Sequence, residues 1–283
     1  SLAPSLYKEE RHKKQGLNMR FVTIASGSSG NCTYIGTDHT HLLVDAGISC
    51  KRIDTGVQEL GIKPDELAGV LITHEHSDHI SGIRVFSKKH HVPIYGTKET
   101  LEAIERMDVK KEIDPDLYRP VRADEQIVVG DFTVTPFSNS HDAANPVGYR
   151  AEAEGHAVGV VTDLGVYSQY TINHLLGLDA VLLEANHDVH MLEAGPYPFP
   201  LKRRILGQKG HLSNEAAGHL LNELLHDGMK HIVLGHLSKE NNYAELAYET
   251  VCCEVNMGEN PYHSGDFPIT VARRDAMSEV IYI

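Results

Sequence analysis

The sequence predicts an α/β fold in which two β-sheets pack face to face and helices cover their outer faces. Short apolar segments typical of strands alternate with amphipathic segments typical of helices along almost the whole chain. The strands fall into two β-rich halves, each with its own helices. Histidines and aspartates follow strands in both halves, so we expect the strand ends of the two sheets to meet at one place.

The length favours one domain. A chain of 283 residues could form one large α/β domain or two smaller ones, and no clear boundary interrupts the pattern. We therefore expect a single catalytic domain over residues 19–283. Residues 1–18 are polar and charged without the apolar segment of a secretory signal, which favours a tag or a flexible extension.

Charge and cysteine content limit the partners and the compartment. The formal net charge of −13 provides no general basic surface for nucleic acid or an anionic membrane, so an anionic substrate would have to be bound locally. No apolar run reaches the length of about 18 residues that predicts a membrane span. The four cysteines lack C-x-x-C spacing, which favours a reduced, cytoplasmic protein. No feature names a protein partner.

The elements of the N-terminal half follow from period-two apolar runs and from capping residues. Strands are expected over 20–25, 33–35, 42–44, 70–73 and 93–95. Residues 26–31 have the composition of a tight turn. A helix is expected over 49–60, with Ser49 as its N-cap and Gly61 ending it. A second helix is expected from His79 or Ile80 to Lys89.

The C-terminal half continues the alternation. Strands are expected over 126–129, 132–137, 147–151, 157–162, 180–183, 232–235, 269–271 and 280–282. A helix over 214–225 carries an apolar stripe at helical period, and another is expected over roughly 243–253. The proline-rich segment 195–200 is expected to be irregular, and it could cover a site as a lid or a substrate wall.

The segment 73–79 carries the clearest functional signal. Its sequence, THEHSDH, places five groups able to bind a metal inside six residues, directly after an apolar run. If 70–73 is a strand, alternation points His74 and His76 the same way. Asp78 and His79 lie beyond the strand, where a turn can direct them to a second metal. A solvated turn is the alternative, which a lone histidine beside one aspartate would favour.

Three more candidate ligands each follow an expected strand, namely His141, Asp163 and His236. Four separate strand ends that carry imidazole or carboxylate favour a metal site over a solvated loop. A pair of metals that shares an activated oxygen suits hydrolysis. The mixture of imidazole and carboxylate ligands suits Zn, Mn or Fe. A thiolate ligand would have favoured zinc, and the candidate set contains none.

The motif H-x-H-x-D-H followed by His, Asp and His resembles the metallo-β-lactamase superfamily over everything after Met19. The resemblance implies an αββα four-layer sandwich and two divalent metal ions. It implies that one metal is held by His74, His76 and His141, that the other is held by Asp78, His79 and His236, and that Asp163 bridges them. The lack of a cysteine ligand departs from several β-lactamases and makes that activity a poor expectation.

The segments GHLS at 210–213 and HLS at 236–238 look like the late motifs of the tRNase Z branch. Segments 25–31, 184–188 and 197–206 are similar to the YycJ (WalJ) family. That resemblance implies a DNA exonuclease that acts from 5′ ends, with a role in mismatch repair, and that hydrolyses phosphodiester bonds with a metal-bridged hydroxide. The implied substrate is a nucleic acid, DNA before RNA.

The resemblance also implies roles outside the metal ligands. His211 would be the general acid and Glu184 the carboxylate that orients it, with Asp78 essential for catalysis. The alternative for His211 is a residue at a helix start beside the cap Ser213. Asp45 would accept a hydrogen bond from a ligand histidine, although it could be an ordinary turn aspartate.

Candidate substrate contacts gather in two places. The glycine turn offers Ser28, Ser29 and Asn31 for phosphate, although a plain tight turn is the commoner use of such a sequence. The late segments offer His187, Lys202, Arg203, Arg204 and Ser213. On an acidic chain, local cations would hold a DNA backbone, and a solvated charge run is the alternative.

Two rival functions use the same residues. One is a small-molecule phosphodiesterase or a thioester or lactone hydrolase with the same metal pair. The other is a non-catalytic regulatory or DNA-binding module whose metals are structural.

Overall fold

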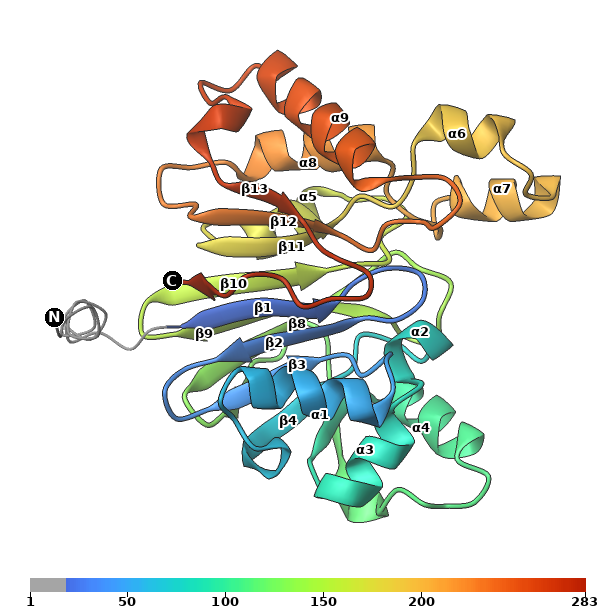
Figure 1. Cartoon of the computed structure of the whole chain (residues 1–283), viewed down its shortest axis with the longest axis vertical. Coiled ribbons are helices and arrows are strands. Elements are labelled where there is room, and N and C mark those ends of the chain that lie inside the picture. Colours follow the sequence, from blue (N-terminus) through green and yellow to red (C-terminus); the bar gives the residue numbers. More distant parts are fainter. Residues whose placement is uncertain (1–18) are drawn as a thin grey trace, which may run out of the picture.

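The computed structural model describes residues 19–283, and two seven-stranded mixed sheets form its centre (Figure 1). The expected tag or extension at residues 1–18 lies outside the described residues. The first sheet runs, in spatial order, β14 (Ile281–Tyr282), β1 (Arg20–Ala25), β2 (Cys32–Gly36), β3 (His41–Val44), β4 (Leu67–Leu71), β5 (Ile94–Thr97) and β6 (Tyr118–Val121). The second runs β13 (Ile269–Val271), β12 (His231–Gly235), β11 (Ala180–Glu184), β10 (His156–Val161), β9 (Val147–Ala153), β8 (Phe132–Ser138) and β7 (Ile127–Val129).

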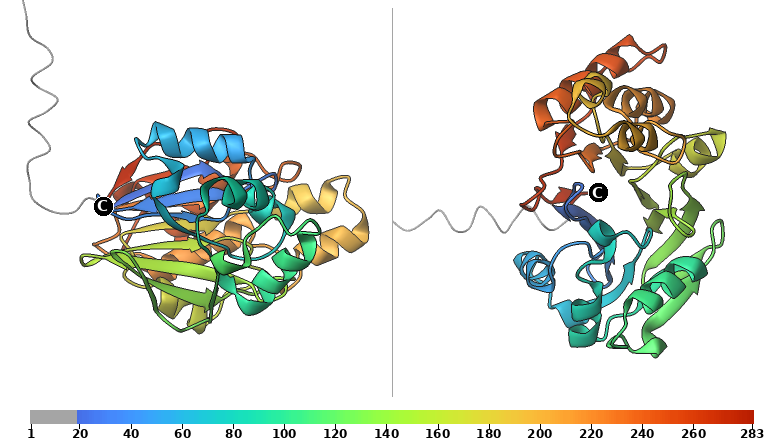
Figure 2. Two further views of the ribbon diagram at one scale, coloured as in Figure 1. Left: turned by 90° about the horizontal axis from the view of Figure 1, so that it is seen from below. Right: turned by 90° about the vertical axis from the view of Figure 1, so that its right-hand side faces the viewer.

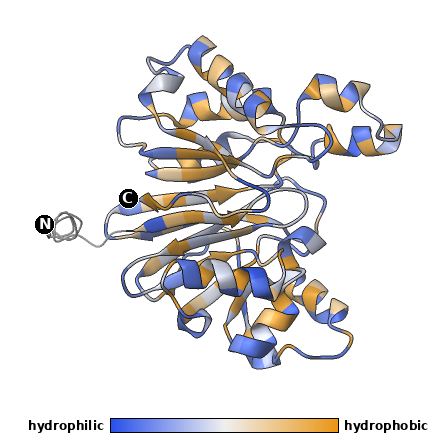
Figure 3. Ribbon diagram, in the orientation of Figure 1, coloured by the Kyte–Doolittle hydropathy of each residue, from blue (hydrophilic) through white to orange (hydrophobic). Residues whose placement is uncertain are grey.

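Alternation along the strands separates the core into layers. In β3, Leu42 joins the cluster between the sheets, whereas Leu43 joins the cluster under the helices of the first sheet. In β12, Val233 faces the space between the sheets and Leu234 faces the helices of the second sheet. Figure 3 shows the resulting concentration of apolar residues in the strands. The αββα four-layer sandwich expected from the sequence is confirmed.

Helices cover both outer faces (Figures 1 and 2). The first sheet is covered by α1 (Cys50–Glu59), α3 (Ile83–His90) and α4 (Lys98–Met107), and the short α2 (Ser77–Ile80) follows the histidine-rich loop. The second is covered by α5 (Gln169–Leu175), α8 (Asn214–Leu224) and α9 (Ala244–Met257). The helices α6 (Val189–Ala194) and α7 (Phe199–Ile205) project to one side of the stack in both figures. Single 3-10 turns occupy Pro64–Glu66, Pro115–Leu117 and Ser264–Asp266.

Parallel pairing positions the candidate site. Strand β3 is parallel to β4, and β10, β11 and β12 are parallel to one another. The carboxyl ends of parallel neighbours lie at the same edge of a sheet, and this edge is where open α/β sheets carry their sites. The loops after β3 and β4 therefore lie together at one edge of the first sheet, and those after β10 and β12 lie together at one edge of the second. Contacts of His79 with Asp163 and of Asp78 with His236 bring the two edges together.

Some element boundaries differ from those expected. Strand β4 ends at Leu71 instead of Thr73, so His74 and His76 lie in a loop and not on a continued strand. The helix expected over 79–89 is interrupted at Gly82, where the Gly82 N–H donates to the carbonyl of Ala46 at 2.8 Å. A Cβ at Gly82 would lie 2.0 Å from the carbonyl oxygen of Ile48, so only glycine allows this close approach.

Helices account for most other differences. The expected helix over 243–253 extends to Met257, and the sequence did not predict the helices α4, α5 and α6 or the strand β6. The segment 195–200 is not irregular throughout, because α7 begins at Phe199. Pro200 is tolerated there because the first turn of a helix lacks partners for its N–H groups. Within residues 19–283, no helix has both the length and the apolar character needed to cross a bilayer.

Candidate metal centre

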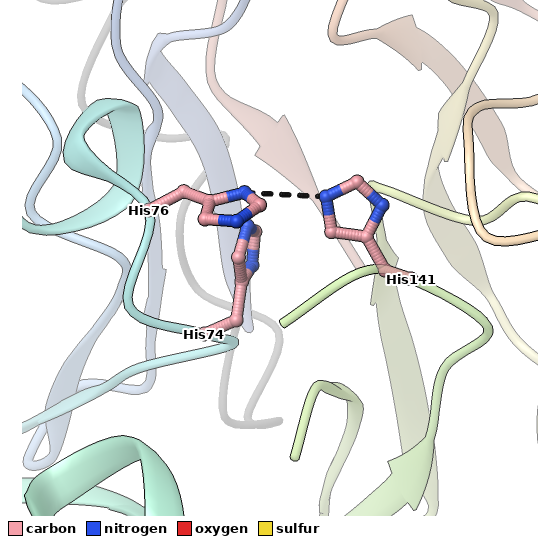
Figure 4. A group of neighbouring side chains, drawn as sticks. All are labelled: His74, His76 and His141. Carbon is pink, nitrogen blue, oxygen red and sulfur yellow. Dashed lines mark hydrogen bonds between the residues drawn. The ribbon is translucent and has the colours of Figure 1, made fainter. Parts of the chain in front are cut away.

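Three histidines from two loops form the first group of candidate ligands. The ring of His74 lies 4.6 Å from that of His76 and 5.0 Å from that of His141, measured between centroids. The Nε2 of His141 is 3.3 Å from the Nδ1 of His76. Figure 4 shows the three rings pointing toward one another. One nitrogen of each ring lies within 4.8 Å of the others, close enough to share one ion.

A second group of three lies beside the first. The Oδ2 of Asp78 is 3.3 Å from the Nε2 of His236 and 3.5 Å from the Nε2 of His79. These three residues offer ligand atoms within 4.8 Å of one another. They come from α2 and from the loop after β12. The two groups are the same two triplets that the sequence resemblance implies.

Asp163 lies between the two groups. Its Oδ2 is 3.1 Å from the Nε2 of His79, and its Oδ1 is 3.5 Å from the Nε2 of His141. Its two oxygens therefore face different groups, which suits a carboxylate that binds two ions. Burial by itself would raise the pKa of Asp163, but the neighbouring His236, His79 and His74 hold it well below its ordinary value.

Hydrogen bonds on the far side of the rings determine which nitrogen faces the centre. A carbonyl or carboxylate oxygen only accepts, so the Nδ1–H donates in each case. The Nδ1 of His79 donates to Asp45 at 2.7 Å, and that of His141 donates to the carbonyl of Gly210 at 3.0 Å. The Nε2 of each ring therefore faces the centre, where the neutral ring could bind a cation.

Asp45 connects two neighbouring loops. Besides its bond with His79, its carboxylate accepts from the backbone N–H of Thr73 at 2.8 Å and from the Thr73 hydroxyl at 2.9 Å. Burial alone would lower the pKa of His79, but Asp163 and Asp45 raise it well above the ordinary value. The carboxylate of Asp45 therefore orients a candidate ligand and fixes the loop that precedes His74.

Glu184 is a fully buried carboxylate with four donors around it. Its Oε1 accepts from the Nδ1 of His211 at 2.8 Å and from the Nδ1 of His236 at 2.7 Å. Its Oε2 accepts from the backbone N–H groups of Leu164 at 2.8 Å and Leu212 at 3.0 Å. Sequence reasoning placed Glu184 beside His211 alone, and its bond to the candidate ligand His236 was missed.

Charges within this cluster shift two pKa values in opposite directions. Burial would raise the pKa of Glu184, but His211 and His236 lower it to about 2. Burial would lower the pKa of His211, but Glu184 and Asp163 raise it above its ordinary value. These shifts favour the carboxylate form of Glu184 and the protonated form of His211, so the pair is suited to hold a proton for donation.

Backbone strain concentrates at the centre. Asp45, Asp163 and His236 have positive φ values of 62°, 57° and 55°. A non-glycine residue in this region costs on the order of 1–3 kcal/mol and persists only where the surroundings enforce it. Each of the three closely follows a strand, and the left-handed turn directs its side chain into the centre.

The donor set fits a divalent metal ion. The Nε2 of His74 is buried and has no hydrogen-bond partner among residues 19–283. Burial and the neighbouring His79 hold the pKa of His74 well below its ordinary value, so the ring is neutral and its lone pair is free. A buried acceptor without a partner costs free energy. Imidazoles and carboxylates gathered in this way match the ligand preferences of Zn, Mn and Fe.

Two of the three glycine-turn candidates form hydrogen bonds within the protein. The hydroxyl of Ser28 is exposed and accepts from the guanidinium of Arg274 at 3.2 Å. Ser29 is exposed. Asn31 is buried, accepts from the Gly27 N–H at 3.0 Å, and has its side-chain nitrogen 3.2 Å from the Nε2 of His79. Asn31 thus supports the turn and lies against the candidate ligands.

Ser213 and His187, two candidate substrate contacts, lie in different environments. The hydroxyl of Ser213 caps α8 by accepting from the Ala216 N–H at 3.2 Å. His187 is buried with its Nδ1 3.3 Å from the Oδ1 of Asn186, and burial lowers its pKa to about 4. His187 is therefore neutral at physiological pH.

The three residues of the basic run 202–204 have different contacts. The ammonium of Lys202 donates to the backbone carbonyl of Glu193 at 2.6 Å. Arg204 forms a bidentate ion pair with Asp142, in which Nη2 lies 2.9 Å from Oδ1. Sequence reasoning missed Asp142. Only its position directly after His141 could have indicated it, and its Oδ1 lies 3.4 Å from the Nε2 of that histidine. Arg203 points to solvent.

Comparison with known proteins agrees with this geometry. The model of the beta-lactamase superfamily domain matches residues 40–236. Exodeoxyribonuclease YycJ of Bacillus anthracis is 38% identical over 235 residues, which cover 83% of this chain and 88% of the relative. Exodeoxyribonuclease WalJ of Streptococcus pneumoniae serotype 2 is 39% identical, covering 83% of this chain and 87% of the relative. The crystal structure of human tRNase Z, short form, shares the fold with a TM-score of 0.63 at 15% identity, covering 92% of this chain and 99% of that one. The chain therefore belongs to the metallo-β-lactamase superfamily, and within it to the YycJ/WalJ family of hydrolases.

Proposed function

We propose that this protein is a two-metal phosphodiesterase that degrades DNA as an exonuclease from 5′ ends. The observation that carries the proposal is the convergence of two three-residue ligand groups on Asp163, beside the pair formed by His211 and Glu184. Two relatives at 38% and 39% identity are named exodeoxyribonucleases, which supports DNA as the substrate. The 5′ polarity and a role in mismatch repair rest on the family resemblance.

The chain's residues would divide the metals as the two groups suggest. One ion would be held by His74, His76 and His141, the other by Asp78, His79 and His236, with Asp163 shared. When bound, the cations would supply Lewis acidity that activates water and neutralises charge on the phosphodiester. Asp45 and Glu184 would keep the Nε2 atoms of His79 and His236 turned toward those ions.

His211 would donate the proton that the departing alkoxide needs. Its ring lies 5.0 Å from that of His141 and 5.4 Å from that of His236, so it borders both ligand groups. Its Nδ1–H is held by Glu184, which leaves the proton on Nε2 for transfer. The raised pKa favours retention of this proton.

A nuclease assay on end-labelled strands tests the proposal. We expect release of nucleotides from the 5′ end of a 5′-phosphorylated DNA strand in the presence of Mn or Zn. The same preparations would be offered a matched RNA strand, bis(p-nitrophenyl) phosphate and a thioester. Faster turnover of either small substrate, relative to its uncatalysed rate, would instead assign a small-molecule hydrolase.

Replacement of Asp78 separates an enzyme from a module with structural metals. The Asp78→Ala protein should lose strand cleavage while keeping the circular dichroism spectrum of the wild type, because the Asp78 side chain contacts the candidate ligands His79 and His236, and alanine keeps its backbone bonds. Unchanged cleavage by this variant would contradict the assignment. Glu75→Ala, an acid in the same loop outside both ligand groups, is the matched control.

A further inference from the structure

The helix α7 is fixed to the candidate metal centre at its C-terminal end. The carbonyl of Ile205 accepts from the backbone N–H of His211 at 3.0 Å. The carbonyl of Gly210 accepts from His141, and Arg204 pairs with Asp142 next to that histidine. A Cβ at Gly210 would lie 2.0 Å from the Ile205 carbonyl oxygen, so the Gly210 backbone packs directly against the end of α7. A ligand bound to α7 would therefore be held at a defined position relative to His211, the candidate general acid.

The other end of α7 carries an exposed aromatic ring. Of the six phenylalanines in the chain, Phe199 has 70% of its surface exposed, whereas none of the other five exceeds 8%. A lone exposed apolar residue is ordinary in itself. Phe199 differs because it begins a helix that projects from the sandwich beside the centre (Figures 1 and 2).

A cation accompanies this ring. The guanidinium carbon of Arg203 lies 5.9 Å from the centre of the Phe199 ring, within the range of a cation–π contact. Among residues 19–283, Arg203 forms no ion pair, whereas Arg204 is paired with Asp142 and Lys202 is bonded to a backbone carbonyl. On a chain with a net charge of −13, an uncompensated arginine over an exposed ring favours an anionic, aromatic ligand.

We propose that Phe199 and Arg203 form a stacking subsite for one base of a single-stranded nucleic acid that extends from the metal centre. The inference rests on the proposed function and deepens it, because it makes a single strand the substrate that reaches the centre. The Phe199 ring would stack on the base, and Arg203 would neutralise an adjacent phosphate. From Phe199 to Ile205 the helix rises about 9 Å, so the base would lie a few nucleotides from the reacting phosphate.

Binding of a nuclease-resistant strand tests the subsite. The probe is a single-stranded phosphorothioate oligonucleotide with 2-aminopurine at successive positions, titrated into the metal-loaded protein. We expect quenching at one position in the wild type. Phe199→Ala should lose that quenching and weaken binding at least about fivefold, since stacking on an aromatic side chain is lost. Phe199→Tyr, which keeps an aromatic ring, should retain both the quenching and the wild-type affinity.

Two further variants separate stacking from charge and from folding. Arg203→Ala should reduce the slope of log affinity against log salt by roughly one, whereas Phe199→Ala should leave that slope unchanged. Tyr282→Ala removes an aromatic side chain that is 60% exposed in β14, at the far end of β1 from the centre, and it should bind the strand like the wild type.

The outcomes are distinguishable. Wild-type affinity and quenching in Phe199→Ala would overturn the stacking subsite, as would failure of the wild type to bind any single strand. A self-association seen by sedimentation that Phe199→Ala abolishes, with strand affinity unchanged, would assign the ring to contact between copies of the chain. Binding of the resistant strand without cleavage of an unmodified one would overturn the proposed function while leaving the subsite supported.

Discussion

Replacing Glu184 by glutamine perturbs the one carboxylate that contacts both the candidate acid and a candidate ligand. All four partners of Glu184 are donors, two on each oxygen. Glutamine keeps the shape but exchanges one oxygen for an NH₂ group, which only donates. In either orientation the NH₂ group faces two donors. If it faces the two rings, each ring could accept only after its Nδ1 had lost its proton. For His236, a shift of that proton to Nε2 would block the nitrogen that faces the centre.

The expected loss follows from the number of bonds removed. A hydrogen bond to a charged group contributes about 1.5–3 kcal/mol, so losing two should lower the free energy of unfolding by about 3–6 kcal/mol. A typical domain is stable by only about 5–15 kcal/mol. Because the pKa of Glu184 is lowered from 4.5 to about 2, its contribution is present at pH 7 and is lost as the pH falls through that interval.

Urea unfolding at pH 7 would measure the change in the metal-free protein, and calorimetric titration would measure divalent-metal affinity. We expect Glu184→Gln to weaken that affinity by about 10- to 100-fold, because an orienting partner of a ligand is lost. Glu193→Gln, an exposed acid on α6, is the control. A loss of stability below about 1 kcal/mol together with unchanged metal affinity would refute the reasoning.

Three further outcomes are expected. In Gly47→Ala the new Cβ would lie 1.7 Å from the backbone oxygen of Asp78, so metal analysis should show weakened binding, whereas Gly265→Ala, with open space around its Cβ, should retain full metal content. Hydrolysis should fall as the pH rises through the raised pKa of His211, and His211→Ala should keep its metals but lose most turnover together with this alkaline limb; wild-type rates would reject the acid role. Removal of divalent ions by a chelator should abolish hydrolysis and lower the melting temperature, and added Mn or Zn should restore both; full activity in the stripped protein would rule out a metal-dependent reaction.

Local spacing made much of the candidate centre predictable. The segment 74–79 places four candidate ligands within six residues, and no distant contact is needed to see them. His141, Asp163 and His236 could be proposed because each follows an apolar strand. Their division into two groups came from family resemblance, and the geometry contains the same groups.

The contacts of Glu184 could not be predicted in this way. Glu184 reaches His236 because β11 and β12 are parallel neighbours, with Glu184 opposite Gly235 in the register. Strand order is a nonlocal property, and a pattern of apolar residues along the chain does not contain it. The pairing of Arg204 with Asp142 is nonlocal for the same reason, and it changed the interpretation of the basic run.

By itself, the sequence determined which chemical groups stand at the ends of the strands, because alternation, turns and motif spacing are local. Only the tertiary structure decided which ring nitrogen of each histidine faces the centre and which arginine of the run 202–204 is left without an ion-pair partner among residues 19–283. Both depend on a hydrogen-bond or ion-pair partner from a distant segment, and folding alone brings that partner into contact.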